Sequence, residues 1–138
     1  MSLRAAQKQM TYELFLAKAL ELFGTKGYAA TTIDDIATAA GSTRTTFYLH
    51  FSSKADVMSA LLTKVDSILT AADDPSLTEV VASGSRALIR QFLDRKLTQW
   101  DEIEPYMTAS YQAAHEPDVA TTTEQWFEGA VADMTAGL

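Results

Sequence analysis

The chain has 138 residues, of which 47% are hydrophobic and 21% charged, and it contains no cysteine. This composition is that of an ordinary globular protein, and the absence of cysteine excludes disulfides, thiolate metal sites and cysteine nucleophiles. No apolar run approaches the ~20 residues of a membrane span, and the polar N-terminus lacks the apolar stretch of a secretory signal. We therefore expect a cytoplasmic protein without a membrane partner.

The net charge of −7 is divided unevenly along the chain. Residues 1–54 hold six basic and four acidic side chains, a net of +2, whereas residues 55–138 hold five basic and fourteen acidic ones, a net of −9. Attraction to phosphate depends on the local field, which falls off within ~8–10 Å at physiological salt. A basic head on an acidic body is therefore compatible with DNA binding, whereas a protein that coats nucleic acid would more often be basic throughout.

The first predicted element is a helix from about residue 6 to residue 25. Its apolar side chains fall on one stripe at helical spacing: Tyr12, Phe15, Ala19, Leu22 and Phe23. Gly27 follows the helix and can adopt the left-handed conformation that ends many helices.

Residues 31–54 predict two short helices joined by a tight turn. Thr32 can cap the first of them, with Asp35 in the reciprocal capping-box position. Gly41 interrupts the apolar spacing, and Thr43 can cap a second helix from 44 to about 50. Two helices across a short turn that contains glycine form a helix-turn-helix, whose second helix can enter the major groove of DNA.

The rest of the chain also predicts helices, and we find no strand. Ser53 caps a fourth helix, which the sequence Ala72-Asp73-Asp74-Pro75 ends with a turn. Further helices are expected at about 77–99, at about 103–114 with Pro105 in the first turn, and from about 118 toward 134. The residues between the last two helices, 115–118, are interpreted as a connector. The predicted fold class is thus all-α, with a three-helix head, residues 1–53, joined by the fourth helix to a helical body, residues 54–138.

Over roughly its first 65 residues the chain resembles the TetR family of bacterial transcriptional repressors. The resemblance rests on an ordered set of residues: Ala19, Leu22-Phe23, Gly27-Tyr28, Thr31-Thr32-Ile33, Asp35-Ile36-Ala37, Ala40-Gly41, Phe47-Tyr48, His50-Phe51 and Lys54. Ser42 and Thr45 depart from the family pattern, which usually has a small apolar residue at the first position and Gly, Ala or Pro at the second. The resemblance implies a dimeric repressor that binds a palindromic DNA operator and is released by a small-molecule inducer.

The candidate DNA contacts lie in and around the second short helix. Its first turn holds Arg44, Thr45 and Thr46, where arginine can pair with guanine and threonine can offer a methyl group to thymine or a hydroxyl to phosphate. Thr43 can serve both as helix cap and as phosphate donor. Tyr48, His50 and Lys54 resemble the phosphate-clamping set of the family. Weaker phosphate candidates are Lys26 and, through its backbone N–H, Thr32.

The second half of the chain is rich in large apolar side chains. In the family, the body holds a pocket for the inducer, and such pockets are mostly apolar. The tentative pocket residues are Phe92, Trp100, Tyr106, Met107, Tyr111, Trp126 and Phe127. The alternative for each residue is an ordinary place in the core.

Nothing in the sequence indicates catalysis, so we do not expect an enzyme. No histidine accompanies a serine nucleophile, no glycine-rich loop could hold phosphate, and the two histidines lack the spacing of metal ligands. We expect no cofactor. Two rival functions remain at this point: a transcriptional activator, or a helical ligand-binding or dimerisation module of the same fold that no longer binds DNA.

The place of the dimer interface is also open. In the family, two final helices usually pair with those of a second copy, but Leu138 lies only ~20 residues beyond the expected start of the last helix near Asp118. We expect the sequence to be truncated at its C-terminus. The alternative is that residues 103–138 form the interface.

Overall fold

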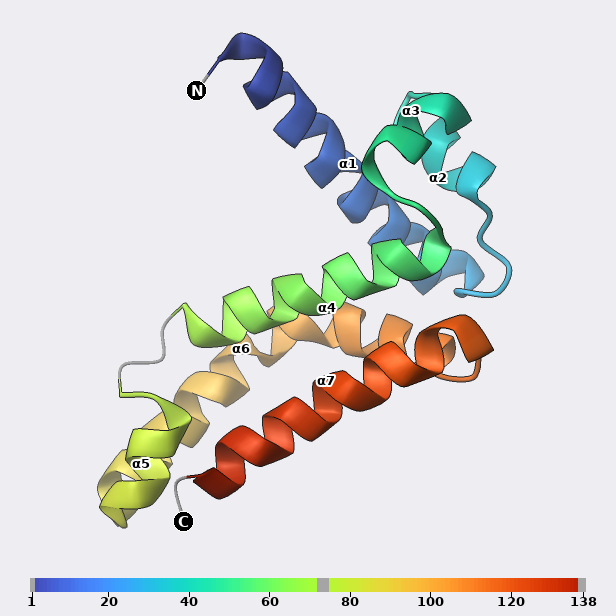
Figure 1. The fold of residues 1–138 in the computed structure, drawn as a ribbon. Helices are drawn as coiled ribbons and strands as arrows, with labels where there is room; N and C mark the ends of the chain where they lie inside the picture. Colours follow the sequence, from blue (N-terminus) through green and yellow to red (C-terminus); the bar gives the residue numbers. More distant parts are fainter. Residues whose placement is uncertain (1, 72–74, 137–138) are drawn as a thin grey trace.

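The computed structural model describes residues 2–71 and 75–136, and within them the chain forms seven α-helices and no strand (Figure 1). The helices are α1 (Leu3–Lys26), α2 (Ile33–Ala39), α3 (Arg44–His50), α4 (Lys54–Thr70), α5 (Leu77–Ser83), α6 (Arg86–Ala113) and α7 (Pro117–Ala136). The predicted all-α fold is confirmed. Of the turn predicted at 72–75, residues 72–74 lie outside the described part.

The head consists of α1, α2 and α3, and local signals fix where its short helices begin. The Thr32 hydroxyl accepts from the backbone N–H of Asp35, whose carboxylate accepts from the N–H of Thr32, so the predicted capping box is present. Gly41 has a φ of 64°, which allows the tight turn between α2 and α3. The core of the head is aromatic, and the rings of Phe15 and Phe47 meet edge to face at 5.6 Å.

Helix α4 joins the head to the body. Ser53 caps it by accepting from the N–H of Asp56. Its buried face includes Val57, Leu61 and Val65. The helix contacts α1 in the head and α6 and α7 in the body. Figure 1 shows α4 running between the head and the two long helices of the body. Helix α4 therefore packs against both halves, which also touch directly through α1 and α6.

The boundaries of the helices between 77 and 114 differ from the prediction. We expected one helix over about 77–99 and another over about 103–114, but α5 ends at Ser83 and α6 runs without interruption from Arg86 to Ala113. Gly84 is left-handed, with a φ of 62°, and Ser85 then caps α6. A glycine followed by a capping serine is a helix-end signal, and the hydrophobic spacing across it concealed that signal.

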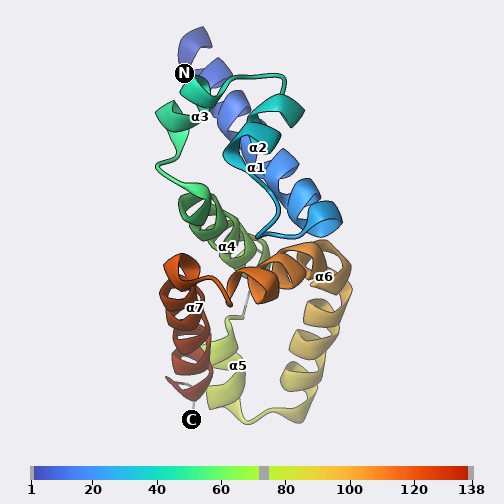
Figure 2. The same cartoon turned by 90° about the vertical axis from the view of Figure 1, so that its right-hand side faces the viewer.

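Pro105 lies inside α6 rather than in the first turn of a new helix. Proline has no backbone N–H, so it cannot bond the carbonyl four residues earlier, and its ring pushes the preceding turn aside. Figure 2 shows α6 changing direction along its length as it approaches α7. We attribute this bend to Pro105, since proline is the commonest cause of a sharp kink.

The connector between α6 and α7 consists of residues 114–116, so the last two residues of the predicted connector, Pro117 and Asp118, belong to α7. The helix α7 begins at Pro117, one residue before the expected start, with proline in the first helical position. It then runs beside α4 and α5. The body is thus a small bundle in which α4, α5, α6 and α7 enclose a common interior.

The conformation of Gly84 gives a stability prediction. Gly84→Ala should lower the free energy of unfolding by about 1–2 kcal/mol because a Cβ is strained at positive φ, although it would meet no atom within 4 Å. Gly24→Ala is the matched control, since its Cβ also meets open space but Gly24 lies within α1. This variant should gain about 0.5–1 kcal/mol. Urea unfolding measures both, and equal effects would contradict the assignment of a left-handed break.

Candidate nucleic-acid interface

The first turn of α3 presents polar side chains at the surface of the head. Thr43 caps the helix by accepting from the backbone N–H of Thr46 at 3.2 Å. Arg44 and Thr45 are exposed, whereas Thr46 is half-buried and its hydroxyl lies 3.1 Å from that of Thr43. The cap therefore orders this turn while the side chains of Arg44 and Thr45 stay exposed to solvent.

The Arg44 guanidinium is held between α2 and α3. One nitrogen, Nη1, lies 3.5 Å from Asp34 Oδ2, and the other, Nη2, lies 3.5 Å from the Tyr48 hydroxyl. The guanidinium also lies over the Tyr48 ring, 5.7 Å from its centroid. The hydrogen bond with Tyr48 and the charge of Asp34 raise the pKa of Arg44. These exposed contacts are weak, so they orient the side chain without preventing it from binding elsewhere.

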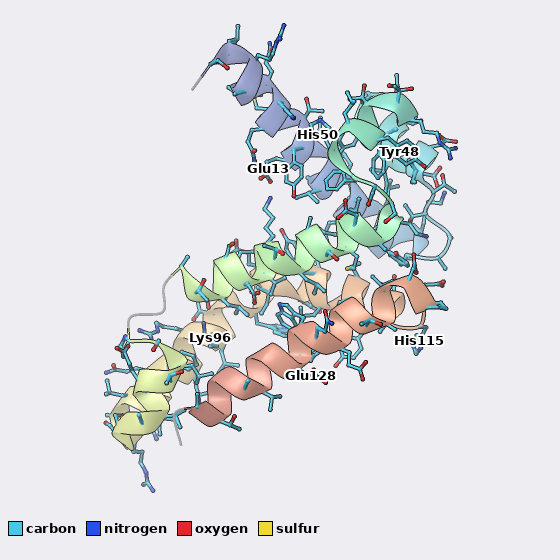
Figure 3. All side chains as sticks on the ribbon, in the orientation of Figure 1. Glu13, Tyr48, His50, Lys96, His115 and Glu128 are labelled. Carbon is cyan, nitrogen blue, oxygen red and sulfur yellow. The ribbon has the colours of Figure 1, made fainter. Side chains whose placement is uncertain are left out.

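Tyr48 and His50 lie close by but differ in their surroundings. Tyr48 is 46% exposed, and its ring meets Phe47 edge to face. His50 packs with its ring centroid 5.7 Å from that of Phe15 and 6.2 Å from that of Tyr12. Burial, and then the charge of Lys8, lower the pKa of His50, so the ring is neutral at pH 7 and offers an N–H without a charge. Figure 3 shows both side chains on the head, away from Lys96 in the body.

Lys54 has internal partners that the sequence did not predict. Its Nζ donates to the backbone carbonyls of Tyr28, at 2.8 Å, and Thr31, at 3.1 Å. The same ammonium lies 4.2 Å from the centroid of the Tyr28 ring. The positive charge of a lysine in the first turn of a helix is repelled by the positive end of the helix dipole. The position of Lys54 in the sequence therefore indicates that its ammonium needs an acceptor, but not which one. Lys54 thus fastens the start of α4 to the loop between α1 and α2.

The same loop is held from the body. The backbone N–H of Tyr28 donates to Gln112 Oε1 of α6 at 3.1 Å. Tyr28 itself is 1% exposed and packs against Phe23. The loop is therefore fixed at one point by α4 and at another by α6.

Lys26 and Thr32 are also engaged within the head. Lys26 Nζ lies 2.7 Å from Asp35 Oδ2, and this hydrogen bond is the main reason why the pKa of Asp35 falls to about 2. The Thr32 N–H, expected to reach phosphate, donates to the same carboxylate at 2.9 Å. Both groups therefore bind the Asp35 carboxylate and stabilise the first turn of α2.

A cavity of about 630 Å³ lies in the body, and most of the tentative pocket residues do not line it. Phe92 and Trp126 line it, but Trp100, Tyr111 and Phe127 are 39–69% exposed and lie outside it, while Tyr106 and Met107 pack against the hydrophobic core. The expected residues were chosen for their aromatic or apolar side chains, and this property does not determine which face of a helix a residue occupies. The sequence analysis missed the other lining residues: Asp66, Leu69, Thr70, Ser76, Leu77, Thr78, Lys96, Gln125, Gly129 and Ala130.

Two hydrogen bonds fix polar side chains that line this cavity. Trp126 Nε1 donates to Asp66 Oδ1 at 3.0 Å, which links α7 to α4. Lys96 donates to the Leu69 carbonyl, and its ammonium lies 4.9 Å from the centroid of the Phe92 ring. A cavity of a few hundred cubic ångströms, mostly apolar with a few convergent polar groups, is typical of a small-molecule site.

Comparisons with known proteins place this chain beside bacterial transcriptional regulators. Residues 15–61 match the family model described as "Bacterial regulatory proteins, tetR family". The chain is 40% identical over 58 residues to the HTH-type transcriptional regulator SrpR of Pseudomonas putida, a match that covers 42% of this chain and 27% of SrpR. It is 38% identical over 78 residues to the HTH-type transcriptional regulator EthR of Mycolicibacterium smegmatis, covering 54% of this chain and 35% of EthR.

A third relative is the uncharacterized HTH-type transcriptional regulator TtgW of Pseudomonas putida. It is 40% identical over 58 residues, which are 42% of this chain and 43% of TtgW. The chain thus spans less than half the length of each of these relatives. The family model covers most of the head and the first part of α4, and this includes the polar turn of α3.

The contacts of Lys54 give a prediction that separates folding from DNA binding. Lys54→Met keeps the apolar stem but removes the ammonium from both carbonyls, of which that of Tyr28 still accepts from the N–H of Thr31, so it should lower the free energy of unfolding by about 1–3 kcal/mol. Lys18→Met is the matched control, since Lys18 pairs only with exposed Glu21 at 3.4 Å and should change stability by less than about 1 kcal/mol. Urea unfolding without DNA measures both. An unchanged Lys54→Met protein would show that the ammonium does not hold the loop.

Proposed function

The chain belongs, through residues 15–61, to the TetR family of bacterial regulatory proteins, and we propose that it is a ligand-responsive transcriptional regulator. Proteins of this family are DNA-binding transcription factors and not enzymes. In our proposal the head, residues 1–53, binds the operator, and the body, residues 54–138, binds the ligand and a second copy. The regulator acts as a repressor in the cytoplasm. Within the described residues, no helix is long and apolar enough to cross a membrane.

The observation that carries this proposal is the ordered, exposed first turn of α3. Arg44 extends from it with both guanidinium nitrogens on weak, exposed partners, and a guanine can replace them with two parallel hydrogen bonds. Thr45 and Thr46 follow on the same turn and offer a methyl group or a hydroxyl to neighbouring bases or phosphates. The net charge of +2 on residues 1–54 favours approach to DNA.

The residues around this turn would then fix the head on the DNA backbone. Thr43, Tyr48 and His50 carry donors that suit phosphate oxygens, and such contacts position a protein without reading sequence. His50 would act as a neutral donor because its pKa is lowered. We assign Lys54 a positioning role in addition to any contact with phosphate, since its ammonium already holds the loop beside α2.

Ligand control is supported by the place of the cavity. Helix α4 supplies Asp66, Leu69 and Thr70 to the cavity at one end and Lys54 to the head at the other. A ligand that fits the cavity better in one position of α4 therefore favours one position of the head. Allosteric control of this kind needs a difference of about 1–3 kcal/mol in binding free energy between the two states.

The operator would be a palindrome bound by a dimer. A two-fold dimer presents two α3 helices, and half-sites in successive major grooves lie ~34 Å apart. A ligand that moves α4 changes the spacing of the two α3 helices, so that they no longer fit both half-sites. Repression is relieved when the ligand binds.

Sequence reading by Arg44 can be tested directly. Cognate sites are first selected from random double-stranded DNA, and binding is then measured by fluorescence anisotropy on a selected site and on a scrambled one. Arg44→Ala should lose about 1–3 kcal/mol of binding free energy on the selected site and much less on the scrambled one. Equal losses on both would mean that Arg44 touches only phosphate. Failure of the unaltered protein to select any DNA would favour a module that no longer binds DNA.

The ligand site can be tested by filling the cavity. Gly129 lines it, and a Cβ placed there meets no atom within 4 Å, so Gly129→Phe should occupy the cavity without disturbing the fold. Binding of the apolar dye anilinonaphthalene sulfonate, followed by fluorescence, should weaken by roughly ten-fold or more because the buried apolar area is lost. Tyr111→Phe is the control, since Tyr111 is 69% exposed outside the cavity. Equal dye binding by both variants would place the ligand site elsewhere.

A further inference from the structure

Two basic side chains in the first turns of α1 have no acceptor within the described residues. Arg4 and Lys8 are both exposed, and neither forms an ion pair or a hydrogen bond in residues 2–71 and 75–136. The other four basic side chains of residues 1–54 have protein acceptors, which are carboxylates for Lys18, Lys26 and Arg44 and two backbone carbonyls for Lys54. The positive charge of the head that no protein group accepts therefore lies on Arg4 and Lys8.

Both side chains lie on the face of α1 that packs against α3. Phe15 marks this face, because its ring centroid lies 5.6 Å from that of Phe47 and 5.7 Å from that of His50. Lys8 stands seven residues and Arg4 eleven residues before Phe15, which is close to two and three whole turns of the helix. The face toward α3 thus continues past the contacting rings with two exposed cations. Figures 1 and 2 both show the first turns of α1 at the same end of the molecule as α3.

The surroundings of Arg4 and Lys8 favour an anion. The charge of Lys8 acts on His50, whose pKa is lowered first by burial and then by this ammonium, so Lys8 lies within electrostatic reach of the last residue of α3. Arg4 lies in the first turn of α1, where the helix dipole disfavours a cation and no acidic residue compensates. Lys8 follows four residues later, a spacing at which like charges repel. An anion beside the pair would offset both effects.

We propose that Arg4 and Lys8 form a second phosphate-binding site of the head, which holds the DNA backbone beside the groove that α3 enters. The inference rests on the proposed function, because it needs α3 to face DNA. A helix of seven residues is ~10 Å long, shorter than the ~12 Å width of the major groove. Even where α3 crosses the groove, the phosphates at its edge lie beyond His50, on the side of Lys8. Such contacts add affinity without reading sequence.

The salt dependence of DNA binding tests this site. Fluorescence anisotropy of the full chain is measured on the selected and the scrambled DNA over a range of salt concentrations. Arg4→Gln and Lys8→Gln should each reduce the slope of log K against log salt by ~0.9 on both DNAs, since each removes one phosphate contact. Arg90→Gln is the matched control, because it makes the same change of charge at an exposed position near the start of α6, far from α3. Its slope should equal that of the unaltered protein.

A relocated charge tests whether the position matters. Lys8→Gln combined with Met10→Lys keeps the net charge but moves the ammonium by about 200° around α1, to a side chain that is 72% exposed. This double variant should keep the reduced slope of Lys8→Gln, whereas Lys8→Arg should keep the slope of the unaltered protein because a guanidinium also binds phosphate. Full recovery by the double variant would show that the charge acts only at long range, and it would overturn the site.

The remaining outcomes separate this site from folding and from the proposed function. Thermal unfolding followed by circular dichroism should show Lys8→Gln to be as stable as the unaltered protein, since the change removes a repulsion. If the unaltered protein selects a DNA site but neither Arg4→Gln nor Lys8→Gln lowers the slope, the inference fails and the proposed function stands. If it selects no site, reduced slopes on scrambled DNA would keep the phosphate site without sequence reading. Unchanged slopes there, or no binding of any DNA, would overturn both.

Discussion

The relation between head and body depends on how the loop after α1 is held. Lys54 at the start of α4 donates to the carbonyls of Tyr28 and Thr31, and Gln112 of α6 accepts the N–H of Tyr28. The Tyr28 ring fills the space between them and is 1% exposed. These few contacts connect three helices that are distant in sequence. Without them α4 would still be a helix, but nothing on the loop side would set its angle to α2 and α3.

The same loop contains a polar group that costs stability. Within the described residues, the buried hydroxyl of Tyr28 has no hydrogen-bond partner. Burial, followed by the charges of Asp118 and Glu116, raises the pKa of Tyr28 well above its ordinary value, so the phenol stays protonated. An unpaired buried hydroxyl costs about 1–3 kcal/mol, the same size as the coupling that ligand control requires.

The head and the body differ in net charge and in the polarity of their surfaces. The head exposes a polar helix turn and carries a small positive charge, whereas the acidic body holds a mostly apolar, partly open cavity and exposes large apolar side chains on α6. An acidic body is repelled by phosphate, which favours approach by the head alone. Helix α6 serves both sides of the body, since Phe92 faces the cavity and Leu93 faces outward.

The sequence by itself determined the head, because its signals are local: the capping box of Thr32 and Asp35, the turn at Gly41 and the cap at Thr43 act within a few residues of one another. Tertiary structure decided the rest. Lys54 bonds a loop 23 and 26 residues away, which no local pattern reveals. The break at Gly84 has a local signal, a left-handed glycine followed by the capping Ser85, which the hydrophobic spacing concealed, whereas α6 continues through Pro105, where the sequence had predicted the first turn of a new helix. Of the expected pocket residues, Phe92 faces the cavity and Trp100 the solvent, since the rotation of a helix is fixed by its neighbours and not by its own aromatic content.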